Sequence, residues 1–106
     1  MKPRHKYNAK ATRKGGVRYA SKLEAECATY LDILKHKGEI VFYLQQVPFH
    51  LAGGVKYICD FQVFWASGEV SFIDAKGVET PTFKLKKKMV EDIYPVEIEI
   101  WKGKKK

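Results

Sequence analysis

Apolar residues recur at helical spacing over residues 21–37, the first clear pattern along the chain. Ser21 is a typical N-cap, and Glu24 follows it by three residues, as in a capping box. Gly38 is a typical residue at the end of a helix. The pattern therefore predicts a helix between Ser21 and Gly38.

The middle of the chain has the two-residue period of β-strands. Residues 39–51 are rich in β-branched and aromatic residues but contain Pro48, which predicts two short strands or one bent edge strand. Every odd position over residues 57–65 is apolar, so we expect one face of this strand to be core and Asp60 to lie on the other face. A polar turn then leads into residues 70–76, which predicts an antiparallel hairpin.

A second helix and a final strand complete the pattern. Thr80 is a suitable cap and Pro81 a suitable first residue for a helix that ends near Tyr94. Residues 96–101 then alternate as a strand. The order helix, three or four strands, helix, strand predicts a compact α/β or α+β domain, and 106 residues suffice for one core.

Charge is distributed unevenly along the chain. The formal net charge is +8, yet 11 of the 20 basic residues lie in residues 1–20 and 102–106, which leaves nine against 12 acidic residues between them. We therefore expect a slightly acidic domain over residues 21–101, a basic flexible N-terminal arm with a hinge at Gly15 and Gly16, and a basic C-terminal tail. Such tails either remain solvated or clamp a polyanion such as nucleic acid.

Composition excludes several classes of protein. No apolar run approaches the roughly 20 residues that span a membrane, and the N-terminus is too basic for a signal peptide. Cys27 and Cys59 lack the spacing of a zinc or redox motif, so we interpret both as core residues of a protein in a reducing compartment. A histidine-built metal site is not expected, because the three histidines are scattered. We expect a cytoplasmic protein without a membrane partner.

An acidic pair and a lysine carry the candidate chemistry. Asp74 and Lys76 are two residues apart on one strand and therefore point to the same face. A hairpin that turns near residues 67–68 places Asp60 opposite about residue 75, beside both. Two adjacent carboxylates disfavour each other's charge unless a cation binds.

The oxygen ligands predict Mg²⁺ or Mn²⁺, completed by water and substrate phosphate. The corresponding reaction is phosphodiester hydrolysis, in which Lys76 orients or deprotonates water and offsets negative charge. The alternative is a structural ion pair between Asp74 and Lys76 with Asp60 exposed. Helical geometry alone does not decide whether Glu24 or Glu26 belongs to the acidic group.

The order of these motifs resembles a known superfamily. The stretches YNAK, YASKLEAE, YICDFQVF, FIDAKGVET and FKLKKK, taken together, resemble a small phage and prophage family within the PD-(D/E)xK nucleases. Their spacing is also similar to that of the endonuclease I class of phage Holliday-junction-resolving enzymes. The resemblance covers residues 7 to about 100. It implies a restriction-endonuclease-like α-β-β-β-α-β core with a mixed sheet flanked by helices.

The resemblance also implies roles for individual residues. Glu24, Asp60 and Asp74 become the acidic, metal-binding set, and Lys76 becomes the catalytic lysine. Cys59 stands where the superfamily has proline, and Asp74 stands where glutamate is common. The shorter side chain of Asp74 leaves less tolerance in its distance to a metal. Superfamily members often carry a glutamine near the metal, which makes Gln46 a possible site residue.

The expected function is cleavage of DNA, with branched DNA as the favoured substrate and a homodimer as the expected state. The alternatives are a general nicking or packaging-associated nuclease and a catalytically inactive DNA-binding module. If the gene is carried by a phage, the protein acts in the cytoplasm of the host bacterium. Lys86 falls within the apolar stripe of the second helix, so it either extends to solvent or binds a phosphate near the site. The expected DNA contacts are Lys84, Lys86, Lys87, Arg13, Lys14 and Arg18.

Overall fold

The computed structural model describes residues 12–14, 17–19 and 21–103. Within them the chain forms two helices, one 3₁₀ turn and six strands. In chain order these are β1 (Thr12–Lys14), β2 (Val17–Tyr19), α1 (Lys22–His36), β3 (Ile40–His50), the 3₁₀ turn η1 (Ala52–Gly54), β4 (Lys56–Trp65), β5 (Val70–Ala75), α2 (Pro81–Ile93) and β6 (Ile98–Trp101).

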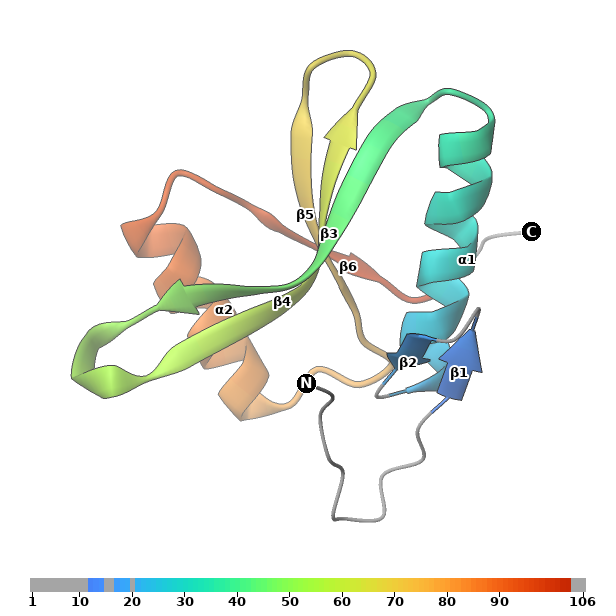
Figure 1. The fold of residues 1–106 in the computed structure, drawn as a ribbon. Coiled ribbons are helices and arrows are strands. Elements are labelled where there is room, and N and C mark those ends of the chain that lie inside the picture. Colours follow the sequence, from blue (N-terminus) through green and yellow to red (C-terminus); the bar gives the residue numbers. More distant parts are fainter. Residues whose placement is uncertain (1–11, 15–16, 20, 104–106) are drawn as a thin grey trace.

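A four-stranded mixed sheet forms the body of the molecule (Figure 1). The strand order is β3-β4-β5-β6, in which β3, β4 and β5 are antiparallel and β6 runs parallel to β5. Helix α2 connects the two parallel strands, as such a crossover requires. The predicted α/β (α+β) fold, with a mixed sheet flanked by helices, is confirmed.

Local capping chemistry sets the bounds of both helices. The Ser21 hydroxyl accepts a hydrogen bond from the backbone N–H of Glu24 at 3.0 Å, and Thr80 accepts one from Phe83 at 3.1 Å. Such a cap typically stabilises a helix by about 1 kcal/mol. At the end of α1, Gly38 adopts a φ of 83°, which glycine tolerates best. The predicted caps and stop signal are therefore confirmed.

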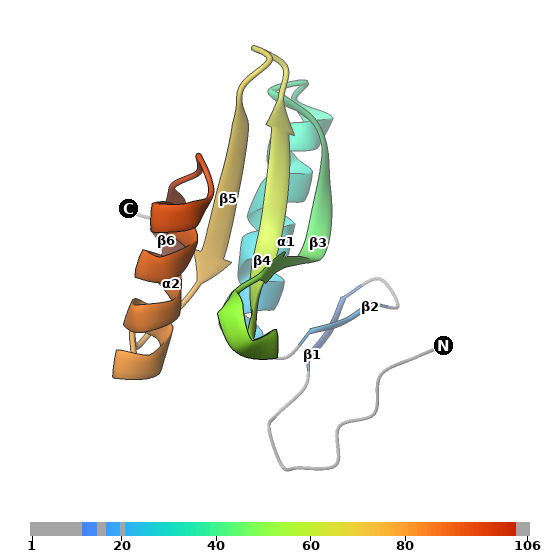
Figure 2. The same ribbon diagram turned by 90° about the vertical axis from the view of Figure 1, so that its left-hand side faces the viewer.

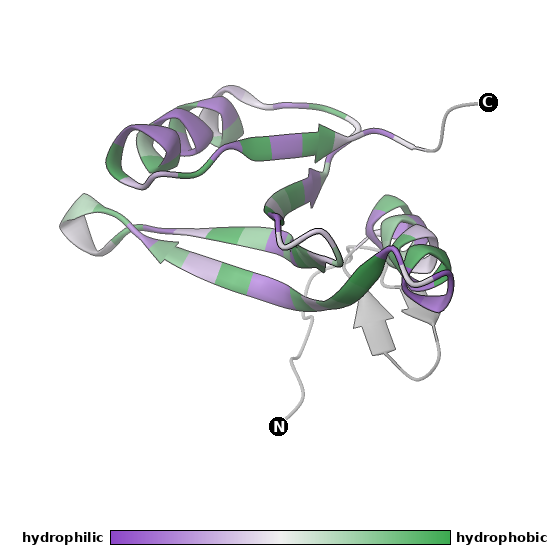
Figure 3. Cartoon of the chain, turned by 90° about the horizontal axis from the view of Figure 1, so that it is seen from above, coloured by the Kyte–Doolittle hydropathy of each residue, from purple (hydrophilic) through white to green (hydrophobic). Residues whose placement is uncertain are grey.

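The apolar side chains form two cores on opposite sides of the sheet. Helix α1 packs on the first core, which includes Leu31, Phe61 and Ile73. Helix α2 packs on the second core, which includes Cys59 and Val90. Figure 2 shows the two helices separated by the strands, and the view from above shows hydrophobic and hydrophilic residues interspersed along the β3–β4 hairpin (Figure 3).

The long β3–β4 hairpin contributes to both cores, which corrects the prediction of a single core face on β4. Phe61 belongs to the α1 core, whereas Cys59, two residues earlier, belongs to the α2 core. The change occurs where Gln46 of β3, with a φ of 55°, lies opposite Asp60. A backbone in this conformation twists the strand. Odd-numbered residues before this position therefore face one helix, and odd-numbered residues after it face the other. The structure selects the bent edge strand among the two predicted alternatives.

The N-terminal segment contains an antiparallel pair of short strands. Arg13 pairs with Arg18 across β1 and β2, and this hairpin lies beside the start of α1 (Figure 1). Sequence patterning predicted a flexible arm here and missed the two strands, because three-residue strands leave too short a pattern to recognise. The predicted hinge at Gly15 and Gly16 lies outside the described residues, as do residues 1–11.

Both cysteines are fully buried, as predicted, and each lies in a different core. Burial is the main reason why the pKa of Cys27 and that of Cys59 are each raised to about 12. Neither thiol is therefore suited to nucleophilic chemistry at neutral pH. None of the described helices has the length and apolar character needed to cross a membrane.

Candidate functional site

Asp60 on β4 and Asp74 on β5 link the two strands through side-chain to backbone hydrogen bonds, at the place where the β4–β5 ladder ends. The last regular pair is Phe61 with Ile73, which puts Asp60 opposite Asp74, one residue from the predicted position 75. The backbone N–H of Asp60 donates to Asp74 Oδ1 at 2.9 Å, and the N–H of Ala75 donates to Asp60 Oδ2 at 3.0 Å. The two carboxylates thus take the place of ladder carbonyls.

The Asp60–Asp74 pair is costly in its charged form. Asp74 is only 1% exposed, and its Oδ2 has no hydrogen-bond partner among the residues that the structure describes. Burial is the main cause that raises the pKa of Asp74, and likewise that of Asp60, above the ordinary value of 3.8. Backbone hydrogen bonds and the Lys76 ammonium lower both values in part. A buried acceptor without a donor is a position where a cation gains most.

Helix α1 brings Glu24 to the same site through Gln46. Glu24 lies in the first turn of α1, is 4% exposed and accepts a hydrogen bond from Gln46 Nε2 at 2.9 Å. The side-chain amide of Gln46 also interacts with the Asp60 carboxylate, which lowers the pKa of Asp60. The structure thereby separates the two candidate glutamates, because Glu26 is exposed and lines an apolar groove beside Trp101 instead.

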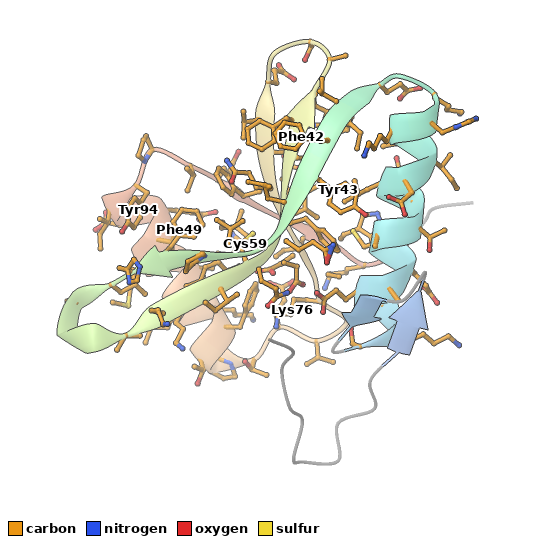
Figure 4. All side chains as sticks on the ribbon, viewed as in Figure 1. Phe42, Tyr43, Phe49, Cys59, Lys76 and Tyr94 are labelled. Carbon is orange, nitrogen blue, oxygen red and sulfur yellow. The ribbon has the colours of Figure 1, made fainter. Side chains whose placement is uncertain are left out.

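Lys76 follows β5 and lies at the meeting point of two clefts (Figure 4). Its backbone N–H donates to the carbonyl of Trp101 on β6 at 3.2 Å, which fixes the chain just after β5. Its Nζ lies 4.9 Å from the centre of the Phe83 ring, a cation–π contact with α2. Lys76 is therefore positioned by β6 and by α2 at once.

The first of the two clefts beside Lys76, which we call the acidic cleft, has a volume of about 380 Å³. It is lined by Glu24, Asp60, Lys76 and the neighbouring Ser21, Leu23, Ala75 and Gly77. The second, which we call the basic cleft, has a volume of about 280 Å³. It is lined by Lys56, Tyr57, Ile58, Asp74, Lys76, Thr80, Thr82, Phe83 and Lys86. The carboxylates of Asp60 and Asp74 thus line different clefts, and Lys76 lines both.

The donor set at the Asp60–Asp74 pair fits a hard cation. Within the described part of the chain, no group of three or more His, Cys, Asp or Glu side chains is gathered so that it could hold a metal ion. Mg²⁺, however, is typically bound by one or two carboxylates and completed by water and substrate phosphate. The partnerless Oδ2 of Asp74 beside the Asp60 carboxylate meets that requirement.

The expected DNA contacts are not all at the site. Lys86 is partly buried, donates to the backbone carbonyl of Lys56 at 3.4 Å and lines the basic cleft. Lys84 is exposed, and Lys87 forms an ion pair with Glu91 at 3.1 Å. For the three expected contacts in β1 and β2, namely Arg13, Lys14 and Arg18, the structure describes the backbone but not the side chains.

Lys56 and Tyr57 line the basic cleft but were not predicted as site residues. The apolar alternation assigned Tyr57 to the core, which is correct for its ring. No local signal revealed that its hydroxyl has no hydrogen-bond partner among the residues that the structure describes. Lys56 is the first residue of β4 and looks like an ordinary solvated strand end in the sequence. The two residues line a cleft together with Lys86 only because α2 packs beside them, which the sequence pattern does not show.

Comparisons with known proteins give a family. No curated protein and no solved structure matches the chain. A profile of the family described as a protein of unknown function (DUF1064) matches residues 4–105, nearly the whole sequence. The chain therefore belongs to the DUF1064 family.

Proposed function

We propose that the protein is a metal-dependent DNA endonuclease of the PD-(D/E)xK type that hydrolyses phosphodiester bonds. The observation that carries this proposal is the pair of the buried Asp74 and the half-buried Asp60, in which Asp74 Oδ2 has no hydrogen-bond partner among the described residues and Asp74 lines a cleft together with Lys76. Buried groups with a perturbed pKa that face a cleft are characteristic of functional sites. A structural ion pair does not account for it, because among the described residues no carboxylate lies within ion-pair distance of Lys76.

Each residue has a distinct role in this proposal. Asp60 and Asp74 would hold Mg²⁺ or Mn²⁺, while Gln46 orients the Glu24 carboxylate through a hydrogen bond and interacts with the Asp60 carboxylate. When bound, such an ion polarises a phosphoryl oxygen and lowers the pKa of a water molecule. Lys76 orients the attacking water and offsets the negative charge that develops on the phosphate in the transition state.

Branched DNA remains the favoured substrate, and the proposal includes a homodimer that acts in the cytoplasm. Symmetric cleavage of a junction requires two active sites related by a two-fold axis. An apolar surface on the β3–β4 hairpin supports a second copy of the chain as the partner. Phe42 is 41% exposed, Leu44 is 45% exposed, and the Phe42 ring stacks on Phe64 with a centroid distance of 4.4 Å.

The test is cleavage of a labelled four-way junction and of a linear duplex of matched sequence, with Mg²⁺, with Mn²⁺ and with EDTA. We expect paired, metal-dependent cuts in the junction that fall by at least about 100-fold in Lys76→Ala and in Asp74→Asn. Circular dichroism and melting curves of both variants serve as folding controls.

Equal cutting of junction and duplex would contradict the branched substrate and support a general nicking or packaging-associated nuclease. Tight DNA binding without any cutting would instead support an inactive binding module. Full activity of both folded variants would overturn the proposed site.

A further inference from the structure

The basic cleft lies against the Asp60–Asp74 pair but differs from it in charge. Three lysines are among the residues that line it, Lys56, Lys76 and Lys86, against a single acidic residue, Asp74. Among the described residues, neither Lys56 nor Lys86 has a carboxylate within ion-pair distance. A concave site with an excess of unpaired ammonium groups attracts an anion.

Lys86 is held toward this cleft by the backbone. Its Nζ donates to the carbonyl oxygen of Lys56 at 3.4 Å, which leaves its remaining N–H groups available. Its neighbours on α2 differ: Lys87 is paired with Glu91, and Lys88 is exposed beside a separate depression near Asp92. Among these three lysines of α2, Lys86 alone lines the basic cleft.

Tyr57 supplies an independent observation. The residue is 4% exposed, lines the basic cleft, and its hydroxyl has no hydrogen-bond partner within the described part of the chain. Its ring is held between aromatic neighbours, with centroid distances of 6.2 Å to Phe49 and 6.0 Å to Phe83. A buried tyrosine hydroxyl usually has a partner, so this donor is satisfied most simply by an acceptor atom of a ligand in the cleft.

We propose that the basic cleft binds one phosphate group of the DNA backbone adjacent to the phosphodiester that is cut. Lys56 and Lys86 are its cationic contacts and the Tyr57 hydroxyl is its hydrogen-bond donor. A phosphate has acceptor oxygens for all three donors, and lysine is a common phosphate contact. This inference rests on the proposed nuclease function, because Asp74 and Lys76 join the cleft to the proposed metal site.

The experiment measures DNA affinity separately from cleavage. Binding of a labelled four-way junction to the full chain is followed by fluorescence anisotropy in EDTA, between about 50 and about 200 mM salt. We expect Lys86→Met and Lys56→Met to weaken binding and to reduce the slope of log K against log salt by about one each. Lys88→Met, a matched change on the exposed face of α2, should affect the slope less.

Tyr57→Phe distinguishes the hydroxyl from the surrounding packing. It removes only the partnerless oxygen, so we expect weaker DNA binding by several-fold, an unchanged salt slope, and a melting temperature that is unchanged or higher. Cleavage of the junction by the wild type in Mg²⁺ is measured in parallel.

The possible results separate the two proposals. If the wild type cuts DNA but Lys56→Met and Lys86→Met behave like Lys88→Met, the phosphate site is wrong and the nuclease stands. If Tyr57→Phe binds DNA as tightly as the wild type, the hydroxyl is not a ligand and the assigned contact set is overturned. If the wild type neither binds nor cuts DNA, the proposed function fails and this inference fails with it.

Discussion

The acidic cleft and the basic cleft share Lys76 but differ in their balance of charge and are supported by different helices. The other charged residues are Glu24 and Asp60 in the acidic cleft, and Lys56 and Lys86 beside a single carboxylate, Asp74, in the basic cleft. Helix α1 provides Glu24 to the acidic cleft, whereas α2 provides Lys86 to the basic cleft. The Asp60–Asp74 pair separates them, with one carboxylate lining each. In the proposed function this difference corresponds to a division of labour, in which the carboxylates of Asp60 and Asp74 bind the cation and the lysines of the basic cleft bind a phosphate.

The largest effect is expected from Glu24→Gln, which removes the charge of Glu24 from the acidic cleft. The change keeps an acceptor for Gln46 but reduces the negative charge of the acidic cleft, and with it the attraction for a cation. We therefore expect the cleavage rate to fall about 10- to 100-fold. DNA affinity in EDTA should stay the same or rise, because a repulsive charge is lost. The readout is a set of single-turnover rates and anisotropy curves for the same preparation.

Glu26→Gln is the matched control, since Glu26 lies on the same helix but is exposed and lines the groove beside Trp101. It should leave the cleavage rate unchanged. A rate that falls equally in both variants would show that the acidic cleft has no special role.

A smaller effect is expected on stability. In EDTA, Asp74→Asn should raise the melting temperature, because it removes a buried carboxylate whose pKa burial raises. Mg²⁺ should stabilise the wild type by about 2.7 kcal/mol at 100 times its Kd, and stabilise Asp74→Asn much less. Melting curves by differential scanning fluorimetry over a Mg²⁺ titration measure both effects. Equal Mg²⁺ stabilisation of the two proteins would place the cation elsewhere.

The smallest effect concerns the two thiols, one beneath each side of the site. Since Cys27 and Cys59 both have a pKa of about 12, neither should react with a chromogenic disulfide reagent in the native protein at neutral pH. With rising denaturant both should become reactive in one transition, because one hairpin contributes to both cores. Separate transitions in the single variants Cys27→Ala and Cys59→Ala would show that the two cores open independently.

The fold was largely predictable because its boundaries depend on local chemistry. Ser21 and Thr80 cap their helices through hydrogen bonds to residues three positions away. The β4–β5 turn contains Gly68 with a φ of 97°, and the tight connection brings Asp60 beside Asp74, as expected. Each of these features can be read from a few neighbouring residues.

The features that were not predictable depend on residues far apart in the chain. Helical geometry could not choose between Glu24 and Glu26, although the family resemblance implied Glu24, because the hydrogen bond that distinguishes Glu24 comes from Gln46, 22 residues away. The division of β4 between two cores follows from the conformation of Gln46, which its residue type does not specify. The role proposed for Tyr57 depends on an absent partner, which only packing reveals.

The β3–β4 hairpin, which crosses from one core to the other, also suggests an order of folding. Its strands are joined by the short turn η1, so their pairing closes a small loop, whereas β5 and β6 pair only after α2 has been placed between them. We therefore expect the hairpin to form early and to present Gln46 and Asp60 before either helix docks. The acidic group is assembled last, when α1 brings Glu24 and β5 brings Asp74, so partly folded chains lack the full set of carboxylates of the proposed site.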